Sequence, residues 1–242
     1  MQKNIDIVIT MAGLGSRFRQ AGYNVPKYMI KVKGKTLFEY SMMSLYGFKN
    51  HVNQYIFIAL KDDFVNVKNF IIDQLSKLEI KNYKIIILDE LTDGQATTAM
   101  FAQKYWKENN ALLIYNIDTY VESGEMSAKD LKGDGFIPCF KAKGDHWSFV
   151  KLDDDGNVVE IKEKQRISDF CTIGAYYFAS CHLFCNLYND FYKQESKNNE
   201  KYIAPLYNHL LDMGGKIYIT EIAAEKVHVL GTPEELEQFL NE

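Results

Sequence analysis

Short apolar segments alternate with helical patterns over the first two thirds of the chain. Four of these apolar segments are typical of buried strands, at residues 5–10, 54–60, 83–88 and 111–116. The stretches between them predict helices at residues 37–48, 62–77 and 96–107. Thr36 and Glu39 form a Thr-x-x-Glu capping box, which sets the start of the first helix. Strands that alternate with helices imply right-handed crossovers and a mostly parallel sheet.

The last third of the chain has a different pattern. Strands with short connections are expected at residues 136–141, 148–152, 158–162 and 171–178, with a hairpin turn at 154–157. Two helices at 180–193 and 203–213, two short strands at 216–220 and 226–229, and a closing helix at 232–240 follow. We therefore predict an α/β fold. It has a Rossmann-like, mostly parallel mixed sheet flanked by helices, with an antiparallel part in the C-terminal half, and the sheet is continuous.

Composition indicates a folded protein with a packed core. The chain has 242 residues, of which 47% are hydrophobic and 14% aromatic. A net charge of −4 gives no reason to expect nucleic-acid binding. Four cysteines do not resemble a disulfide framework, and the chain shows neither a secretory signal pattern nor an apolar run of membrane-spanning length. We therefore expect a cytoplasmic protein with no membrane partner.

A glycine-containing loop follows the first predicted strand. Residues 11–18 read Met-Ala-Gly-Leu-Gly-Ser-Arg-Phe, and open α/β sheets bind ligands at the C-terminal ends of their strands. Glycines there let backbone N–H groups approach a phosphate. Residues 7–38 contain no acidic residue but six cations: Arg17, Arg19, Lys27, Lys31, Lys33 and Lys35. This pattern favours a polyanion site with Arg17 and Lys27 as functional cations, whereas the last three lysines are interpreted as a solvated basic face.

Two other glycine-loop motifs are excluded by the sequence. A dinucleotide-binding fingerprint needs a third glycine where Phe18 stands and an acidic residue about 20 positions further on. Neither is present. A P-loop ending in Gly34-Lys35-Thr36 would need its earlier glycine where Met29 stands.

The loop and its neighbours resemble the signature of the sugar-phosphate nucleotidyltransferase family. The matching motifs are Gly13-x-Gly15-x-Arg17-Phe18, Pro26-Lys27 and Gly34-Lys35. The family includes sugar-1-phosphate thymidylyl- and uridylyltransferases and phosphocholine cytidylyltransferases. The resemblance implies one domain over residues 1–242, in which 1–118 bind the nucleotide and 119–242 the acceptor. It also implies that Arg17 and Lys27 are catalytic, and that the nucleotide lies on Ala12, Gly13, Leu14 and Gly15.

Later motifs are similar to the family's remaining site segments. Gly94 and Gln95 match the segment that faces the base, although an ordinary glycine turn explains them equally well. Glu163 and Lys164 match the pair that meets the acceptor and its phosphate, with an exposed charged strand end as the alternative. Gly174 matches the glycine that lets the acceptor approach the sheet.

Asp118 ends the fourth strand where the family has its metal-binding aspartate. The resemblance implies Mg²⁺ as the cofactor, with Mn²⁺ as an alternative. The acidic residue expected just before Gly231-Thr232-Pro233 is absent, because Val229 and Leu230 stand there. A second metal ligand, if there is one, is sought among Glu221, Glu225 and His228.

The resemblance implies an enzyme that transfers a nucleoside monophosphate from a triphosphate to a small phosphorylated acceptor. The short chain favours CMP and a capsule-type acceptor such as phosphocholine, phosphoglutamine or a sugar phosphate. The alternatives are a sugar-1-phosphate thymidylyl- or uridylyltransferase, and a nucleotide-binding protein without turnover. A glycosyltransferase would want Asp-x-Asp where this chain has Asp118-Thr119-Tyr120. A homodimer remains open.

Overall fold

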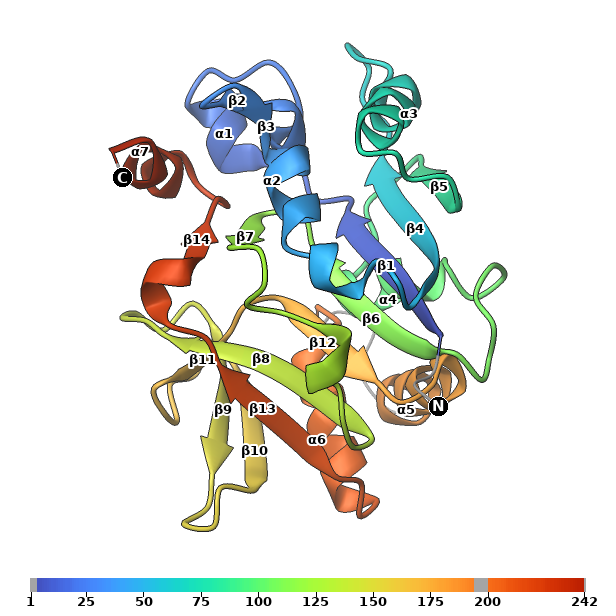
Figure 1. Cartoon of the computed structure of the whole chain (residues 1–242), viewed down its shortest axis with the longest axis vertical. Helices are drawn as coiled ribbons and strands as arrows, with labels where there is room; N and C mark the ends of the chain where they lie inside the picture. Colours follow the sequence, from blue (N-terminus) through green and yellow to red (C-terminus); the bar gives the residue numbers. More distant parts are fainter. Residues whose placement is uncertain (1–3, 194–199, 242) are drawn as a thin grey trace.

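One large sheet with helices on both faces makes up most of the molecule (Figure 1). The computed structural model describes residues 4–193 and 200–241. From one edge to the other, the sheet contains β10 (Val158–Glu163), β9 (Ser148–Leu152), β11 (Phe170–Thr172), β8 (Gly135–Lys141), β12 (Ala175–Phe178), β6 (Ala111–Asn116), β1 (Ile5–Met11), β4 (Val52–Leu60) and β5 (Tyr83–Leu88). A further strand, β13 (Ile217–Glu221), pairs with β8.

The sheet is parallel in its N-terminal half and mostly antiparallel in its C-terminal half. Strand β1 lies between β6 and β4, with β5 beyond β4, and these pairs are all parallel. Strand β12 runs antiparallel to both β6 and β8 and joins the two halves. The predicted α/β fold class, with a mostly parallel sheet and an antiparallel C-terminal part, is confirmed.

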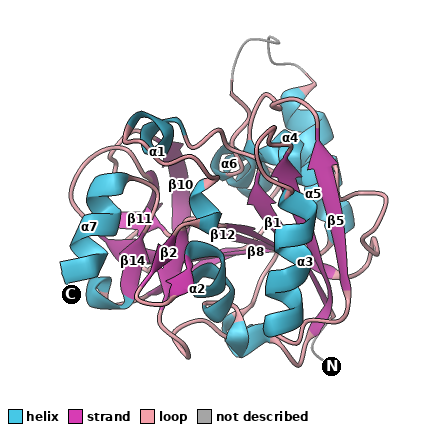
Figure 2. Ribbon diagram, turned by 90° about the horizontal axis from the view of Figure 1, so that it is seen from above, coloured by secondary structure: helices cyan, strands magenta, loops and turns pink. Residues whose placement is uncertain are grey.

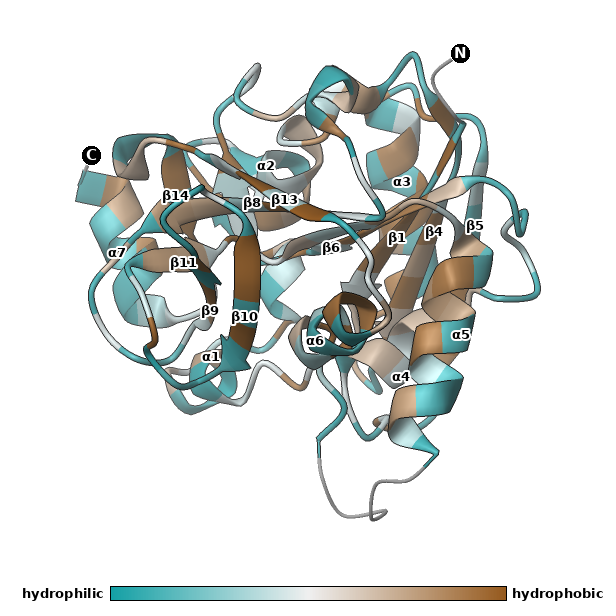
Figure 3. Ribbon diagram, turned by 90° about the horizontal axis from the view of Figure 1, so that it is seen from below, coloured by the Kyte–Doolittle hydropathy of each residue, from teal (hydrophilic) through white to brown (hydrophobic). Residues whose placement is uncertain are grey.

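Helices cover the two faces of the sheet in two groups. Helices α2 (Leu37–Met43) and α3 (Val67–Lys77) pack over one face (Figure 2). Helices α4 (Gln95–Met100), α5 (Cys181–Tyr192) and α6 (Ala204–Asp212) pack over the other (Figure 3). Apolar strands such as β1 and β4 lie between these layers, which explains why their sequences are almost continuously hydrophobic.

A third apolar cluster joins the two ends of the chain. Helix α7 (Pro233–Asn241) contributes Leu236 and Phe239, which pack against Phe18 of α1 (Ser16–Gln20) and against Leu230. The glycine loop is therefore held next to the C-terminal segment. No helix in the described residues has the length and apolarity needed to span a bilayer.

Three expected helices are shorter than their sequence patterns predict. The expected helix at 37–48 divides into α2 and a short 3₁₀ turn at Tyr46–Phe48. Helix α3 begins at Val67 instead of residue 62, because the Asp62 carboxylate accepts hydrogen bonds from two following backbone N–H groups and forms a turn. Helix α4 ends at Met100, since tighter bonds such as Phe101 N–H to the Thr98 carbonyl replace the α-helical pattern.

Two strand predictions also need correction. The single strand expected at 171–178 is divided at Gly174, because β11 pairs with β8 and β9 whereas β12 pairs with β6 and β8. The strand expected at 226–229 does not join the large sheet. It forms β14 (Val227–Val229), which pairs with β7 (Thr119–Val121) in a separate ribbon.

Candidate active site

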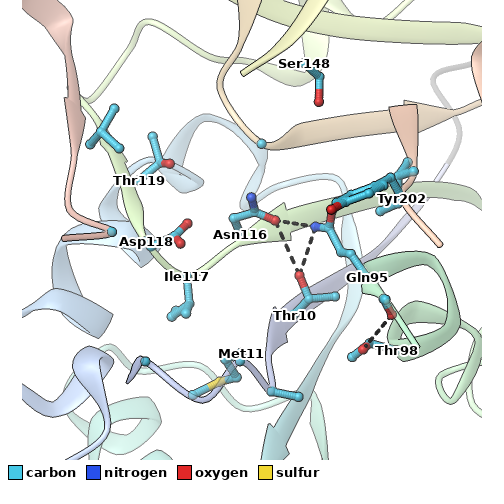
Figure 4. Close-up of a pocket in the computed structure, with 18 of the residues that line it drawn as sticks. Thr10, Met11, Gln95, Thr98, Asn116, Ile117, Asp118, Thr119, Ser148 and Tyr202 are labelled. Carbon is cyan, nitrogen blue, oxygen red and sulfur yellow. Dashed lines mark hydrogen bonds between the residues drawn. The ribbon is translucent and has the colours of Figure 1, made fainter. Parts of the chain in front are cut away.

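A cavity of about 510 Å³ opens where the parallel and antiparallel halves of the sheet meet. Its wall is formed by the glycine loop, the C-terminal end of β6, the start of α4, the antiparallel strands and the turn before α7 (Figure 4). The site residues expected from the sequence that line it are Ala12, Gly13, Gly15, Arg17, Lys27, Gly94, Gln95, Asp118, Glu163 and Gly174.

Strand register explains why residues distant in sequence meet here. Strands β1 and β6 are parallel neighbours, and Thr10 lies opposite Asn116. The glycine loop after β1 and Asp118 after β6 therefore emerge from the same edge of the sheet, where open α/β sheets place their ligand crevice. Leu14 belongs to the same loop, but its side chain is 58% exposed and lies outside the lining. The expected contact between Leu14 and the nucleotide remains a prediction.

Lys27 and Asp118 form an ion pair in the cavity wall. Lys27 begins a 3₁₀ turn after Pro26, and its Nζ donates to Asp118 Oδ2 at 2.6 Å. Both side chains are partly buried, with exposures of 17% and 28%. Arg17, on α1, is exposed and lines the same cavity. Two cations beside a glycine loop provide positive charge that suits the binding of phosphate groups.

A polar cluster lies beside the ion pair at the ends of β1, β6 and α4. Gln95 Nε2 donates to Asn116 Oδ1 and, at 3.1 Å, to Thr10 Oγ1 (Figure 4). These bonds hold the Gln95 amide against the sheet edge. The sequence did not single out Thr10. Its only signal was its position as the polar end of a buried strand.

The glycine before Gln95 has a packing role. Gly94 has a φ of 146°, and a Cβ there would collide with the backbone of Lys201. Ala96 N–H donates to the Lys201 carbonyl, and Lys201 N–H donates to the Asp93 carbonyl. The segment after residue 199 is therefore anchored to the loop that carries Gln95.

Glu163 lies towards the antiparallel end of the cavity. Its carboxylate accepts a hydrogen bond from Ser148 Oγ, and the Ser148 hydroxyl lies 3.3 Å from the Tyr176 hydroxyl. Burial raises the pKa of Glu163, and its bond from Ser148 opposes that effect only in part. Neither Ser148 nor Tyr176 was expected from the sequence, because both lie on ordinary alternating strands.

Lys164, next to Glu163, lies on the other side of this wall. Its Nζ donates to the Tyr202 hydroxyl and lies 3.9 Å from a Glu200 carboxylate oxygen. The bond to Tyr202 raises the pKa of Lys164. Lys164 is exposed and lies outside the cavity lining, whereas Tyr202 and Glu200 belong to it. The expected contact between Lys164 and an acceptor phosphate therefore remains a prediction.

Gly174 makes space for a neighbouring strand residue. It has a φ of 79°, and a Cβ would collide with the side chain of Asn116. The Gly174 carbonyl also accepts the Asn116 N–H at 3.0 Å. The sequence interpretation assigned this glycine to the approach of an acceptor, and the packing against Asn116 supplies a structural reason for it.

The three residues considered as second metal ligands lie outside the cavity lining. Glu221 pairs with Lys141 at 2.9 Å, Glu225 lies in an exposed turn, and His228 stacks on the Tyr120 ring with centroids 5.3 Å apart. Glu221 and His228 thus have local partners on other parts of the surface, and none of the three lines the cavity with Asp118. The carboxylate that does line the cavity near Asp118 is Glu235 on α7, which the sequence interpretation missed.

Glu163 makes a testable contribution to the pH dependence of stability. Because its pKa in the folded protein is raised above the ordinary value of 4.5, the folded state loses stability relative to the unfolded state as pH rises above that value. Glu163→Gln removes this charge and keeps an oxygen that can accept from Ser148. We expect its melting temperature to exceed that of the wild type at pH 7.5 and to match it at pH 4. The exposed control Glu237→Gln should shift neither value, and an equal shift at both pH values would contradict the assignment.

Comparison with known proteins agrees with this geometry. Residues 7–221 match the family described as Nucleotidyl transferase. The crystal structure of the nucleoside-diphosphate-sugar pyrophosphorylase from Vibrio cholerae RC9 is 33% identical, has a TM-score of 0.87, and aligns over 98% of this chain and 100% of that one. No curated protein sequence matches the chain.

Two further structures share the fold at lower identity. The inositol-1-phosphate CTP transferase from T. maritima is 14% identical, with a TM-score of 0.77 over 100% of this chain and 98% of that one. The CTP:phosphocholine cytidylyltransferase from Streptococcus pneumoniae is 17% identical, with a TM-score of 0.72 over 98% of each chain. Because the family match covers most of the chain and the Vibrio relative aligns over its full length, the chain belongs to the nucleotidyl transferase family, whose members are enzymes of the EC 2.7.7 type.

Proposed function

We propose that the protein transfers CMP from CTP to a small phosphorylated acceptor and releases pyrophosphate. The observation that carries this proposal is the single cavity between the glycine loop and Glu163. Arg17, Lys27 and Asp118 lie at the end of the cavity that we assign to the phosphates, with Gln95 beside them, and Glu163 lies towards the antiparallel strands.

The reaction requires positioning and charge stabilisation more than a protein nucleophile. An oxygen of the acceptor phosphate attacks the α-phosphorus of the triphosphate and forms a new P–O bond. The bond from the α-phosphorus to the bridging oxygen breaks, and its electron pair leaves with pyrophosphate. The acceptor phosphate is already anionic, so no general base is needed. Arg17 and Lys27 stabilise the charge that develops on the phosphoryl oxygens.

The donor chemistry of the cavity fits a hard divalent cation, which we propose to be Mg²⁺ with Mn²⁺ as an alternative. Mg²⁺ binds proteins through one or two carboxylates and takes its remaining ligands from phosphates and water. Asp118 supplies such a carboxylate. In the described residues no group of three or more His, Cys, Asp or Glu side chains is arranged to hold a metal. The bound cation would neutralise triphosphate charge while Lys27 moves from Asp118 to a phosphate.

The preference for CTP is supported by the amide of Gln95, which lines the cavity. Gln95 Nε2 donates to Asn116 and Thr10, which leaves the amide oxygen to accept a hydrogen bond from the amino group of a cytosine base. Two of the similar structures are named as CTP-using transferases. The Vibrio relative is named as a nucleoside-diphosphate-sugar pyrophosphorylase, which supports a sugar phosphate acceptor and keeps a thymidylyl- or uridylyltransferase as the alternative. Phosphocholine and phosphoglutamine are the other proposed acceptors. With each of these acceptors, we propose that the product is a precursor for capsule synthesis.

A screen of pyrophosphate release tests this proposal. Four nucleoside triphosphates are combined with Mg²⁺ and a panel of phosphorylated sugars, phosphocholine and phosphoglutamine. We expect CTP to give the highest rate with one acceptor class. A higher rate with TTP or UTP and a sugar 1-phosphate would contradict the assignment of CTP and indicate a thymidylyl- or uridylyltransferase. Thermal stabilisation by triphosphate without pyrophosphate release from any combination would indicate a binding protein and would contradict the proposal.

Two further parts of the proposal concern the cell and the assembly. We propose a cytoplasmic location, where nucleoside triphosphates are made, and the four cysteines are buried free thiols that suit a reducing compartment. A homodimer remains a prediction that light scattering would test.

A further inference from the structure

We propose that Glu235 supplies the second carboxylate to the divalent cation, in place of the acidic residue that is missing before Gly231. This inference rests on the proposed function, because it concerns the metal that accompanies the triphosphate. Glu235 lines the same cavity as Asp118 and Lys27, although it belongs to the last helix of the chain.

The β7–β14 ribbon brings the start of α7 to the metal aspartate. Val229 pairs with Thr119, and Leu230 N–H donates to the Asp118 carbonyl at 2.8 Å. The turn that follows therefore runs alongside the segment that carries Asp118. Figure 1 shows α7 connected to this ribbon, near α1 and β2.

The two carboxylates lie around Gly231. A Cβ placed on Gly231 would be 3.4 Å from Glu235 Oε2 and 3.5 Å from Asp118 Oδ2. The position that a side chain would fill is thus bordered by an oxygen from each carboxylate. Asp118 is also drawn at this wall of the cavity in Figure 4. Two carboxylates close to one point agree with the one or two that Mg²⁺ takes from a protein when phosphate oxygens and water complete its ligands.

Only one of the two oxygens of the Glu235 carboxylate takes part in capping helix α7. Glu235 N–H donates to Thr232 Oγ1 at 3.2 Å, and Oε2 accepts the Gly231 N–H at 3.0 Å. This arrangement is a variant of the capping box, which the Thr232-x-x-Glu235 pattern predicts. Oε2, the oxygen nearest the Gly231 Cβ position, holds the cap, whereas Oε1 accepts no hydrogen bond from the described part of the chain; a cation would therefore be bound through Oε1 while Oε2 keeps the Gly231 N–H. The capping bond meanwhile fixes the orientation of the carboxylate, as a partner does for a metal ligand.

Charge at this position also favours a cation. Asp118 is neutralised by Lys27, whereas no salt bridge involves Glu235 in the described residues. When Lys27 turns to a phosphate, two carboxylates face the same space without a counter-ion. The negative charges of Asp118 and Glu235 then repel each other, and a divalent cation between them relieves that repulsion. The lost acidic residue on β14 is thereby replaced from the neighbouring helix.

Binding of Mn²⁺ in the presence of CTP, measured by electron paramagnetic resonance, tests the inference without measuring turnover. Glu235→Gln keeps an oxygen for the Gly231 N–H but removes the charge. We expect it to weaken Mn²⁺ binding in the ternary complex by about tenfold or more, since loss of outer partners alone costs 10- to 100-fold. CTP binding in EDTA and the melting temperature should stay close to wild-type values. Glu234→Gln, on the exposed adjacent position of α7, is the matched control and should bind Mn²⁺ normally.

The outcomes separate this inference from the proposed function. Wild-type Mn²⁺ affinity in Glu235→Gln, together with a large loss in Asp118→Asn, would show that Glu235 only caps α7 and would overturn the inference alone. Failure of the wild-type protein to take up Mn²⁺ with any of the four triphosphates would overturn the proposed function and the inference together. If Glu235→Gln melts early, its Mn²⁺ affinity is measured below the melting range, and the same criterion applies.

Discussion

Lys27→Ala and Arg17→Ala should each reduce the rate of pyrophosphate release by about 10²- to 10³-fold, the usual loss when one preorganised donor to transition-state charge is removed. Both side chains line the cavity beside the glycine loop, and Lys27 also neutralises Asp118. The measurement is kcat and KM in the combination of triphosphate and acceptor that the screen identifies. A fall in kcat with little change in KM would indicate that the contact is made mainly in the transition state.

Lys31→Ala is the matched control for this prediction. Lys31 belongs to the same basic stretch as Lys27, but it is exposed and lies outside the cavity lining. Its variant should keep the full rate, and all three variants should melt at similar temperatures. Near wild-type rates in Lys27→Ala and Arg17→Ala would show that the triphosphate binds elsewhere.

Asp6→Ala should destabilise the protein by roughly 3 kcal/mol or more, because it leaves several buried donors without an acceptor. Asp6 lies on β1 with 0% exposure. Its carboxylate accepts from Asn53 Nδ2 at 2.7 Å, Gln54 Nε2 at 3.1 Å, Lys107 N–H at 2.9 Å and Asn110 Nδ2 at 3.0 Å. One carboxylate thus ties the starts of β1, β4 and β6 together.

Urea unfolding followed by circular dichroism measures this effect. The midpoint should fall with little change in the slope, since the same surface is exposed on unfolding. Asp63→Ala removes an exposed carboxylate and should leave the midpoint unchanged. A loss below 1 kcal/mol in Asp6→Ala would mean that water satisfies the orphaned donors and that the network is not needed for stability.

Local pattern was sufficient for the fold class, since buried parallel strands are almost continuously apolar and helices show their own period. The capping box of Thr36 and Glu39 is present with both reciprocal bonds, and α2 begins where it predicts. Helix ends and strand partners were harder to predict from the sequence. The division of 171–178 at Gly174 depends on which strands flank β11 and β12, and the glycine alone does not identify those partners.

The candidate site divides in the same way. Because parallel strands end at a common edge, the glycine loop and Asp118 could be placed at the same edge of the sheet from the sequence, whereas the structure decided that β1 and β6 are neighbours. Lys27 followed from its place in the basic stretch. The Asn116 side chain over Gly174 and the Lys201 backbone against Gly94 involve contacts between distant segments, which a single sequence does not disclose.

Periodicity was enough to predict the α/β fold, and the glycine loop with its basic neighbours was enough to predict a polyanion site, because each is a local signal whose physical cause lies within a few residues. The step to a nucleotidyltransferase came from the resemblance of these motifs to that family. The approach of Glu235 to Asp118, the Asp6 network and the ribbon of β7 with β14 were decided by tertiary structure alone. Those contacts join segments up to about a hundred residues apart. Their geometry depends on how sheets and helices pack, and packing is a property of the folded chain as a whole.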